Sequence, residues 1–377
     1  MIKFEIKKLI NNKAAIGGVI IAILILGGII STFYTGSQLG GGSSSDPIHG
    51  RQAIMLNQKI AEQHTGPLTD DRIEKIIDFR AETQNKEYRK KHFMDVFSWA
   101  VADKFIPENY QDKFYGIEKV SRKGVEIMPV NQLGTVIPPS KLKLGNFAPW
   151  YQLFSLMSAS IILISVLAIY LCSSVFSGDE SKHLMPLLLT TKYGRTKLTK
   201  SKLLATFIIS TTIFVIVQLI TIGIFGKYFS FSGWDTSIQL NLFWNIFNFP
   251  INMNFMQLLF WTIAVQYLGL MFTILITCFI SSYTKNSSTS LAVSLLFYFI
   301  PLLLTIVFRS GIISKLLNLF PIVNSNVQKF VTNLSNPGQL LFNNVEANII
   351  LTSSFMIFVA IVGSVVVYLH VKKEKNS

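Results

Sequence analysis

Six stretches of the chain hold no acidic or basic residue over lengths that suffice to cross a membrane. Each contains 19 to 27 residues, and roughly 20 apolar residues of α-helix span the hydrocarbon core of a bilayer. A charge at the centre of a span costs about 2.5 to 3.5 kcal/mol on insertion scales, so uncharged stretches between charged loops predict transmembrane helices. The predicted spans are residues 14–34, 150–176, 203–225, 255–280, 290–308 and 347–370.

The orientation of these spans follows from the bases next to their ends. Fourteen Lys and Arg residues lie before the first span, in the second and fourth connections and after the last span, whereas the short loops of the other side hold four: Lys227, Arg309, Lys315 and Lys329. Basic loops stay in the cytoplasm. We therefore expect both termini to be cytoplasmic and residues 35–149 to lie outside the cell.

The inserted region 35–149 shows helical patterns behind a glycine- and serine-rich linker at residues 40–45. Thr69 is placed to cap a helix that opens with two acidic residues, and the apolar positions after it keep the spacing of one helix face. A second apolar face ends where Pro107 stops it. These faces consist of Ile73, Ile76 and Ile77, and of Phe93, Val96, Phe97, Ala100, Val101 and Phe105.

The pattern thus predicts an all-α polytopic membrane protein with six transmembrane helices and a mainly helical extracytoplasmic domain between helices 1 and 2. Its parts are residues 1–34, 35–149 and 150–377. Two loop segments of the last part are unusually apolar: 226–254 holds Trp234, Trp244, Phe247 and Phe249, which suits the outer interface. Short helices that re-enter the outer leaflet would account for residues 309–345.

Composition and charge agree with a membrane protein and exclude a nucleic-acid binder. Half of the residues are hydrophobic and 14% are charged, against about 25% in an average soluble domain. The net charge of +14 resides mainly outside region 35–149, which holds 14 of the 20 acids and 16 of the 34 bases. The excess bases flank the spans, and no stacking-aromatic or zinc pattern accompanies them. Cys172 and Cys278 lie inside predicted spans, so no disulfide framework is expected.

The chain lacks the usual motifs of catalysis. It holds no phosphate-binding loop, no HExxH and no GxSxG motif, and no Asp, Glu or Lys lies within a predicted span. The spacing of His49, His64 and His92 matches no common zinc motif. We expect no catalytic residue, no cofactor and no metal, and the absence of intramembrane carboxylates argues against an ion-coupled carrier.

The loop that follows the second span combines charge and apolarity in a particular order. It opens with Asp179 and Glu180, continues through an apolar patch at 184–189, and ends in a basic run. This order resembles the coupling-helix region of ABC-2 type permeases, the membrane subunits of many ABC exporters. The resemblance implies that loop 177–202 contacts a separate ATPase through Asp179, Glu180, Lys182, Lys192, Tyr193, Gly194, Arg195 and Lys197. Which of the two acids has the coupling role stays open.

The N-terminus supports the same resemblance. Phe4 and Glu5, followed by Lys7 and Lys8, are typical of the interfacial helix with which such permeases often begin before the first span. The resemblance covers residues 1–34 and 150–377 and leaves the outer domain unexplained. It implies a cytoplasmic ABC ATPase subunit that binds the ATP, a second permease subunit in a homodimer or heterodimer, and a location in the bacterial plasma membrane.

We therefore expect a membrane-spanning permease subunit of an ATP-driven exporter, with a path for amphipathic or hydrophobic cargo such as a peptide, an antibiotic or a lipid. One alternative is a receptor-like or regulatory membrane protein whose outer domain senses a ligand. Another is an intramembrane enzyme that acts on lipid, which the lack of polar catalysts in the spans disfavours.

Overall fold

The computed structural model describes residues 1–11, 13–35, 48, 50–84, 93–116, 120–183 and 197–373. Its contacts divide the chain into two compact units. Unit 1 comprises residues 1–29, 157–220 and 262–377, and unit 2 comprises residues 30–156 and 221–261. We describe each unit by itself.

The long helices coincide with the predicted spans. Among the described residues, five helices are long and apolar enough to cross a membrane. They are α7 (Ala148–Cys172) with its extension to Glu180, α10 (Lys197–Phe229), α11 (Phe255–Tyr283), α12 (Ser287–Val307) and α16 (Val345–Lys373). The first predicted span is helical as α2 (Lys13–Thr35), whose fully described part, Ile16–Thr32, is apolar and shorter than the five long helices.

The core of unit 1 is built from residues of α1 (Ile2–Ile10), α7, α10, α11 and α16. Leu9, Ala168, Ala205, Leu270 and Val367 are buried together there. The helices are joined by side-chain hydrogen bonds as well: Gln218 Nε2 donates to Gln266 Oε1 at 3.0 Å, and the hydroxyls of Thr211 and Tyr267 lie 3.0 Å apart. Buried polar groups of this kind hold helices together where lipid offers no hydrogen-bond partner.

Several helices present large apolar faces to the outside. In the most apolar 18-residue stretch of α16, 17% is buried inside the protein, whereas the corresponding value for α7 and its extension is 67%. α7 is therefore central and α16 is peripheral. Exposed apolar surface on this scale is rare on soluble monomers and marks a membrane or subunit contact. Examples are Ile23 and Leu24 on α2, Leu219 on α10, Leu303 and Val307 on α12, and Phe358 and Ile361 on α16.

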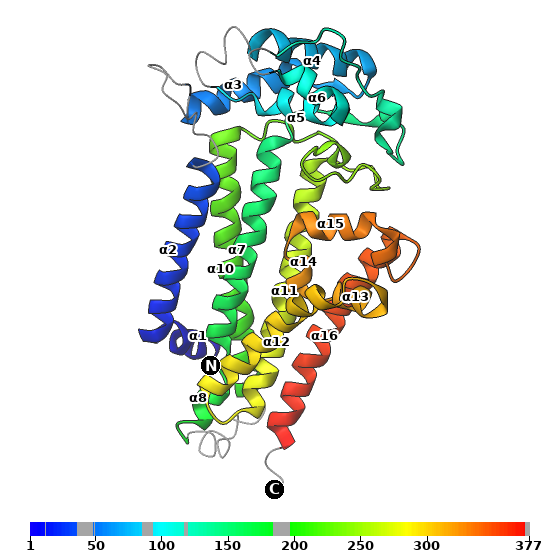
Figure 1. The fold of residues 1–377 in the computed structure, drawn as a ribbon. Helices are drawn as coiled ribbons and strands as arrows, with labels where there is room; N and C mark the ends of the chain where they lie inside the picture. The colour runs from blue at the N-terminus through cyan, green and yellow to red at the C-terminus, as the bar shows by residue number, and fades with distance from the viewer. Residues whose placement is uncertain are drawn as a thin grey trace. The chain divides into compact units, whose positions relative to one another are not determined.

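The apolar segment 309–345 is mostly helical. It contains α13 (Gly311–Leu317), α14 (Pro321–Asn324), α15 (Val327–Ser335) and the 3₁₀ turn η6 (Pro337–Gln339). Figure 1 shows these short helices beside α12 and α16 within unit 1. Polar side chains fix the segment: Ser314 Oγ donates to Gln339 Oε1 at 2.8 Å, and Gln339 Nε2 donates to the carbonyl oxygen of Arg309 at 3.0 Å.

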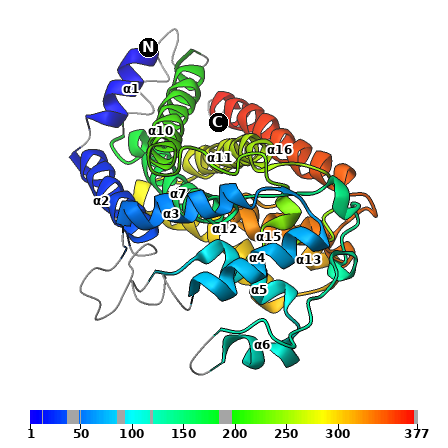
Figure 2. The same cartoon turned by 90° about the horizontal axis from the view of Figure 1, so that it is seen from above.

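Among the described residues of region 35–149, unit 2 contains four α-helices. They are α3 (Gly50–Gln63), α4 (Asp70–Thr83), α5 (Val96–Phe105) and α6 (Glu108–Tyr115). Figure 2 shows α3, α4 and α5 side by side. The predicted cap is confirmed, because Thr69 Oγ1 accepts a hydrogen bond from the Arg72 amide at 3.3 Å. The predicted apolar faces of α4 and α5 are confirmed too, since Ile73, Ile76, Ile77, Val101 and Phe105 are fully buried.

Unit 2 also contains two short strands, the first turns of α7 and residues 221–261. Two two-residue strands, β1 (Gly66–Pro67) and β2 (Lys143–Leu144), pair in antiparallel fashion. The first turns of α7 belong to the unit, and the indole nitrogen of Trp150 donates to the carbonyl oxygen of Ser232 at 2.8 Å. In segment 226–254, Trp234 is 51% exposed, whereas Trp244, Phe247 and Phe249 are buried in the unit.

His64 gives unit 2 a dependence on pH. Its ring lies against Phe79 and Phe97, with centroids 5.0 and 6.5 Å away, and burial lowers the pKa of the imidazole, while the Arg72 guanidinium lowers it further and Asp95 opposes both. The ordinary pKa of about 6.5 applies to the unfolded chain, so the folded state binds a proton less readily. His64 therefore leaves the free energy of unfolding unchanged above that pH and lowers it as the pH falls below that value.

We predict that amide exchange in α3 to α5 of the full chain accelerates as the pH is lowered from neutral, after correction for intrinsic exchange rates. His64→Gln, which does not titrate, should reduce this acceleration. Burial raises the pKa of Asp95, which acts with the opposite sign in both proteins, so the difference between them isolates the imidazole. Equal acceleration in both proteins would show that His64 is not responsible.

Candidate functional site

The N-terminal helix α1 has a buried and an exposed face. Glu5 and Leu9 are buried, whereas Phe4 is 69% exposed and Lys7 is exposed as well. Figures 1 and 2 show α1 lying crosswise to α2, which suits a helix in the plane of a membrane surface. Two charged residues of α1, Glu5 and Lys8, thus point toward the interior of unit 1.

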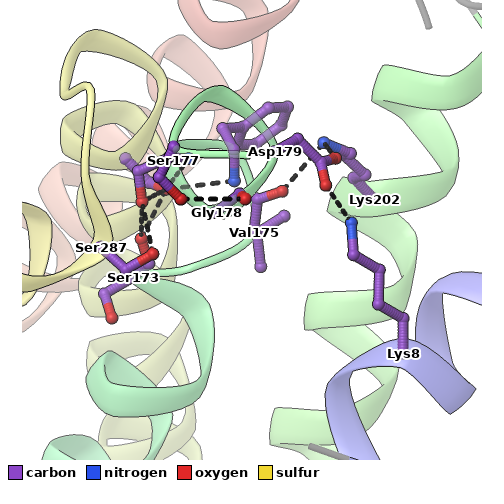
Figure 3. A network of polar contacts seen from close by, with 11 residues as sticks. Lys8, Ser173, Val175, Ser177, Gly178, Asp179, Lys202 and Ser287 are labelled. Carbon is purple, nitrogen blue, oxygen red and sulfur yellow. Dashed lines mark hydrogen bonds and ion pairs between the residues drawn. The ribbon is translucent and has the colours of Figure 1, made fainter. Parts of the chain in front are cut away.

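Asp179 is the centre of the polar cluster that these residues join. It belongs to α8 (Ser177–Glu180), a single turn after α7, and its side chain is 1% exposed. One carboxylate oxygen pairs with Lys8 Nζ and the other accepts from Lys202 Nζ at 2.5 Å (Figure 3). One buried carboxylate therefore joins the N-terminal helix, the turn after α7 and the start of α10.

Lys202 is as deeply buried as its partner, with a side-chain exposure of 1%. Its ammonium group also donates to the carbonyl oxygen of Val175 at 2.9 Å and lies 4.8 Å from the centre of the Phe176 ring. An isolated buried charge would cost several kcal/mol, and the paired carboxylate, the carbonyl and the ring together offset that cost.

Glu5 completes the charge balance of the cluster. It interacts electrostatically with Lys202 and Lys8, and burial raises the pKa of its carboxyl although both lysines oppose that effect. Two carboxylates and two ammonium groups therefore meet at this end of unit 1. The arrangement is close to neutral, which lowers the cost of burying the Asp179 and Lys202 side chains, each 1% exposed.

Serine hydroxyls hold the turn before Asp179 in place. Ser281 Oγ, at the end of α11, accepts from the amides of Phe176 and Ser177 at 3.2 and 3.1 Å and donates to the carbonyl oxygen of Ser173 at 2.7 Å. Ser177 and Ser287, the latter at the start of α12, have their hydroxyl oxygens 3.5 Å apart (Figure 3). α8 is therefore bound to two further helix ends.

The end of α16 reaches the same end of unit 1. Lys200 Nζ lies 5.6 Å from the centre of the Tyr368 ring, two residues along α10 from Lys202. The ring of His370 stacks on Tyr283 with centroids 3.7 Å apart. The first helix, the last helix and the turn α8 thus share one end of the unit.

The structure describes part of the predicted coupling site. Glu180, Lys182 and Lys197 are exposed, in contrast to Asp179, and of the predicted residues in α1 Glu5 and Lys8 join the buried cluster while Phe4 and Lys7 face outward. The other predicted residues, Lys192, Tyr193, Gly194 and Arg195, lie outside the described residues.

Sequence reasoning missed Lys202 and the serines as members of this site. Lys202 counted only as one of the bases that set the orientation, and a serine at a helix end has many structural roles. A signal did exist for Lys202: it is the last charge before an uncharged stretch, as Asp179 is among the first charges after another. Two such opposite charges at neighbouring span ends favour pairing.

Among the residues that the structure describes, no group of three or more His, Cys, Asp or Glu side chains is placed to hold a metal ion. The charged groups of Lys8, Asp179 and Lys202 bond to one another, so the arrangement is suited to fixing a short turn.

We predict that Asp179→Asn lowers the unfolding free energy of the full chain by about 3 kcal/mol or more, because it leaves the Lys202 ammonium buried without a carboxylate. Thermal unfolding in a mild detergent measures the effect. Glu180→Gln removes the neighbouring, exposed charge and should change stability by less than about 0.5 kcal/mol.

A second variant keeps this prediction testable if Asp179→Asn fails to fold. Combining Asp179→Asn with Lys202→Met removes both charges, and should recover much of the lost stability because no unpaired charge stays buried. Equal melting temperatures for Asp179→Asn and Glu180→Gln would mean that the ion pair does not hold α8.

Comparison with known proteins gives one family match. A family model described as ABC-2 family transporter protein matches residues 1–371, which include α1, α8 and all the candidate spans except the last two residues of α16. No curated protein and no solved structure matches the chain.

Proposed function

The chain belongs to the ABC-2 family of transporter membrane proteins, and on that premise we propose that it is the membrane-spanning permease subunit of an ATP-driven ABC exporter. ABC-2 permeases generally pair with ATPase subunits, and the family's membrane subunit is typically not catalytic. The energy for transport then comes from ATP bound by a partner chain, in agreement with the lack of a phosphate-binding loop in this sequence.

The observation that best supports this role is the firm attachment of α8 to the helix ends around it. The turn is bound to α1 and α10 through Asp179, and to α11 and α12 through serine hydroxyls. A force applied to the chain just after α8 would therefore reach four helices at once. Conformational coupling needs such an element, because it must bias two arrangements of the spans.

We assign different tasks to the two acidic residues of loop 177–202. Asp179 is the internal anchor, because it is buried and bonded on both oxygens. Glu180 and Lys182 are exposed and contact the ATPase, together with Lys197 and with the undescribed residues Lys192, Tyr193, Gly194 and Arg195. Charged ends on a short docking segment fix its register in a partner's groove.

The helices support the following membrane arrangement. α2 serves as the first of six spans, both termini lie in the cytoplasm of a bacterial cell, and region 35–149 with segment 309–345 lies on the outer side. The shared end of α1, α8 and α16 supports a common side for the two termini. The basic residues gathered at this end agree with the cytoplasmic bias of Lys and Arg.

A second permease subunit, identical or similar, completes the path. The exposed apolar faces of α2, α10, α12 and α16 are available for lipid and for this subunit. A path between such faces suits amphipathic or hydrophobic cargo such as a peptide, an antibiotic or a lipid better than a small hydrophilic solute. Residues 35–149 shape the exit of that path.

We predict that the tagged full chain, purified from its native cells in a mild detergent, retains an ABC ATPase that mass spectrometry identifies by its phosphate-binding loop. Glu180→Arg should reduce the recovered ATPase at least tenfold, because it reverses an exposed charge at the docking segment without disturbing the buried cluster. The matched control is Glu108→Arg, which reverses an exposed charge on α6 in unit 2 and should leave recovery unchanged.

Normal recovery of the ATPase with Glu180→Arg, or the absence of any ATPase from the unmodified protein, would contradict the proposed function. The thermal unfolding of each variant, measured in parallel, shows whether a loss of recovery comes from lost contact or from lost fold.

A further inference from the structure

Unit 2 contains an open cleft between α3 and the end of α10, with a volume of about 510 Å³. Arg51, Met55, Lys59 and Glu62 line it at the spacing of one face of α3. Lys227 and Tyr228 of α10 form the opposite wall. None of its lining residues belongs to loop 177–202 or to the cluster around Asp179, so the cleft is separate from the coupling described above.

The charges in this cleft are unbalanced. Arg51, Lys59 and Lys227 make no ion pair with any residue that the structure describes. Among the described residues of the lining, Glu62 is the single carboxylate, and its Oε1 already accepts from Gln58 Nε2 at 2.9 Å and from Ser232 Oγ at 3.1 Å. Those donors are neutral, so the lining holds three positive charges against the one negative charge of Glu62, and this excess favours the entry of an anion.

The apolar surroundings distinguish the type of anion. Along α10, Ile216, Leu219 and Gly223 lead at helical spacing to Lys227, and Leu219 is 66% exposed. α10 is a candidate membrane span, so this exposed apolar face suits contact with lipid, and Lys227, the first charge after the uncharged stretch 203–225, suits the edge of the hydrocarbon. Met55, which is 60% exposed in the cleft, adds apolar surface beside the cations. A free anion would gain nothing from these apolar groups, whereas a lipid would contact them with its chains.

We propose that this cleft binds the phosphate-bearing headgroup of an anionic phospholipid from the leaflet at the C-terminal end of α10. Arg51, Lys59 and Lys227 surround the phosphate. The Arg51 guanidinium is able to bind two phosphate oxygens at once. The acyl chains extend along the exposed face of α10. The bound lipid holds α3, the first helix of the outer region, against the end of the span.

Native mass spectrometry of the purified full chain in detergent tests the site, with no need for the ATPase. The probes are dimyristoyl phosphatidylglycerol, dimyristoyl phosphatidylcholine and inorganic phosphate. The variant Arg51→Gln/Lys227→Gln is compared with Lys123→Gln/Lys141→Gln, which removes two exposed cations from the same unit outside the cleft. Each Lys or Arg near an anionic headgroup contributes a similar binding free energy, and the loss of two such residues lowers the affinity roughly 30-fold.

We expect the unmodified chain to bind one phosphatidylglycerol in preference to phosphatidylcholine. The cleft variant should lose roughly 30-fold in affinity for it, and the control variant should bind as the unmodified chain does. Equal binding of the two lipids, or equal loss in the cleft and control variants, would overturn the proposal. Displacement of phosphatidylglycerol by inorganic phosphate at similar concentrations would show that the cleft takes a free anion and would overturn the assignment to lipid.

Discussion

The carboxylate of Asp179 between Lys8 and Lys202 is the interaction on which the arrangement of unit 1 at this end depends. It joins residues that are 171 and 23 positions apart in the chain, and its side chain is 1% exposed. Removing ionised groups from water costs several kcal/mol for each group, so such a cluster is stable only when all its members are present and bonded. The position of α8 is therefore defined by the folding of α1 and α10 as well as by its own residues.

The spans show how the same helices meet two requirements. Their buried faces hold polar side chains in pairs, such as Gln218 with Gln266 and Thr211 with Tyr267. Their outer faces are apolar, as on α12 and α16. α7 is the most enclosed of the long helices, and α8 follows it directly. Movement of α8 would thus act first on α7, the most buried of the long helices.

The sequence was sufficient to predict the helices but not their side-chain contacts. Uncharged stretches predicted the long helices within a few residues, because charge is excluded from spans whatever their packing. Asp179 and Glu180 were not distinguished, since adjacent residues point about 100° apart on a helix and the direction of the interior is set by packing. Lys202 was missed for the same reason: its burial depends on where α10 crosses the turn after α7.

Unit 2 shows which features depend on local spacing and which do not. The cap at Thr69 and the apolar faces of α4 and α5 depend on local spacing, and the sequence predicted them. The burial of Trp244 depends on a distant part of the chain, because its ring lies against that of Phe154 with centroids 5.5 Å apart. No local pattern separates such aromatic residues from those that lie at a membrane interface, because both environments favour the same side chains.

The contact between loop 177–202 and an ATPase is the central claim, and site-specific photo-crosslinking in membranes tests it most directly. A photoreactive residue in place of Glu180 should form a covalent adduct with an ABC ATPase, identified by mass spectrometry. The same residue in place of Lys123, exposed in unit 2, should form none. An ATPase adduct from position 123 and none from position 180 would contradict the account, because the ATPase would then bind elsewhere than at the turn that Asp179 anchors.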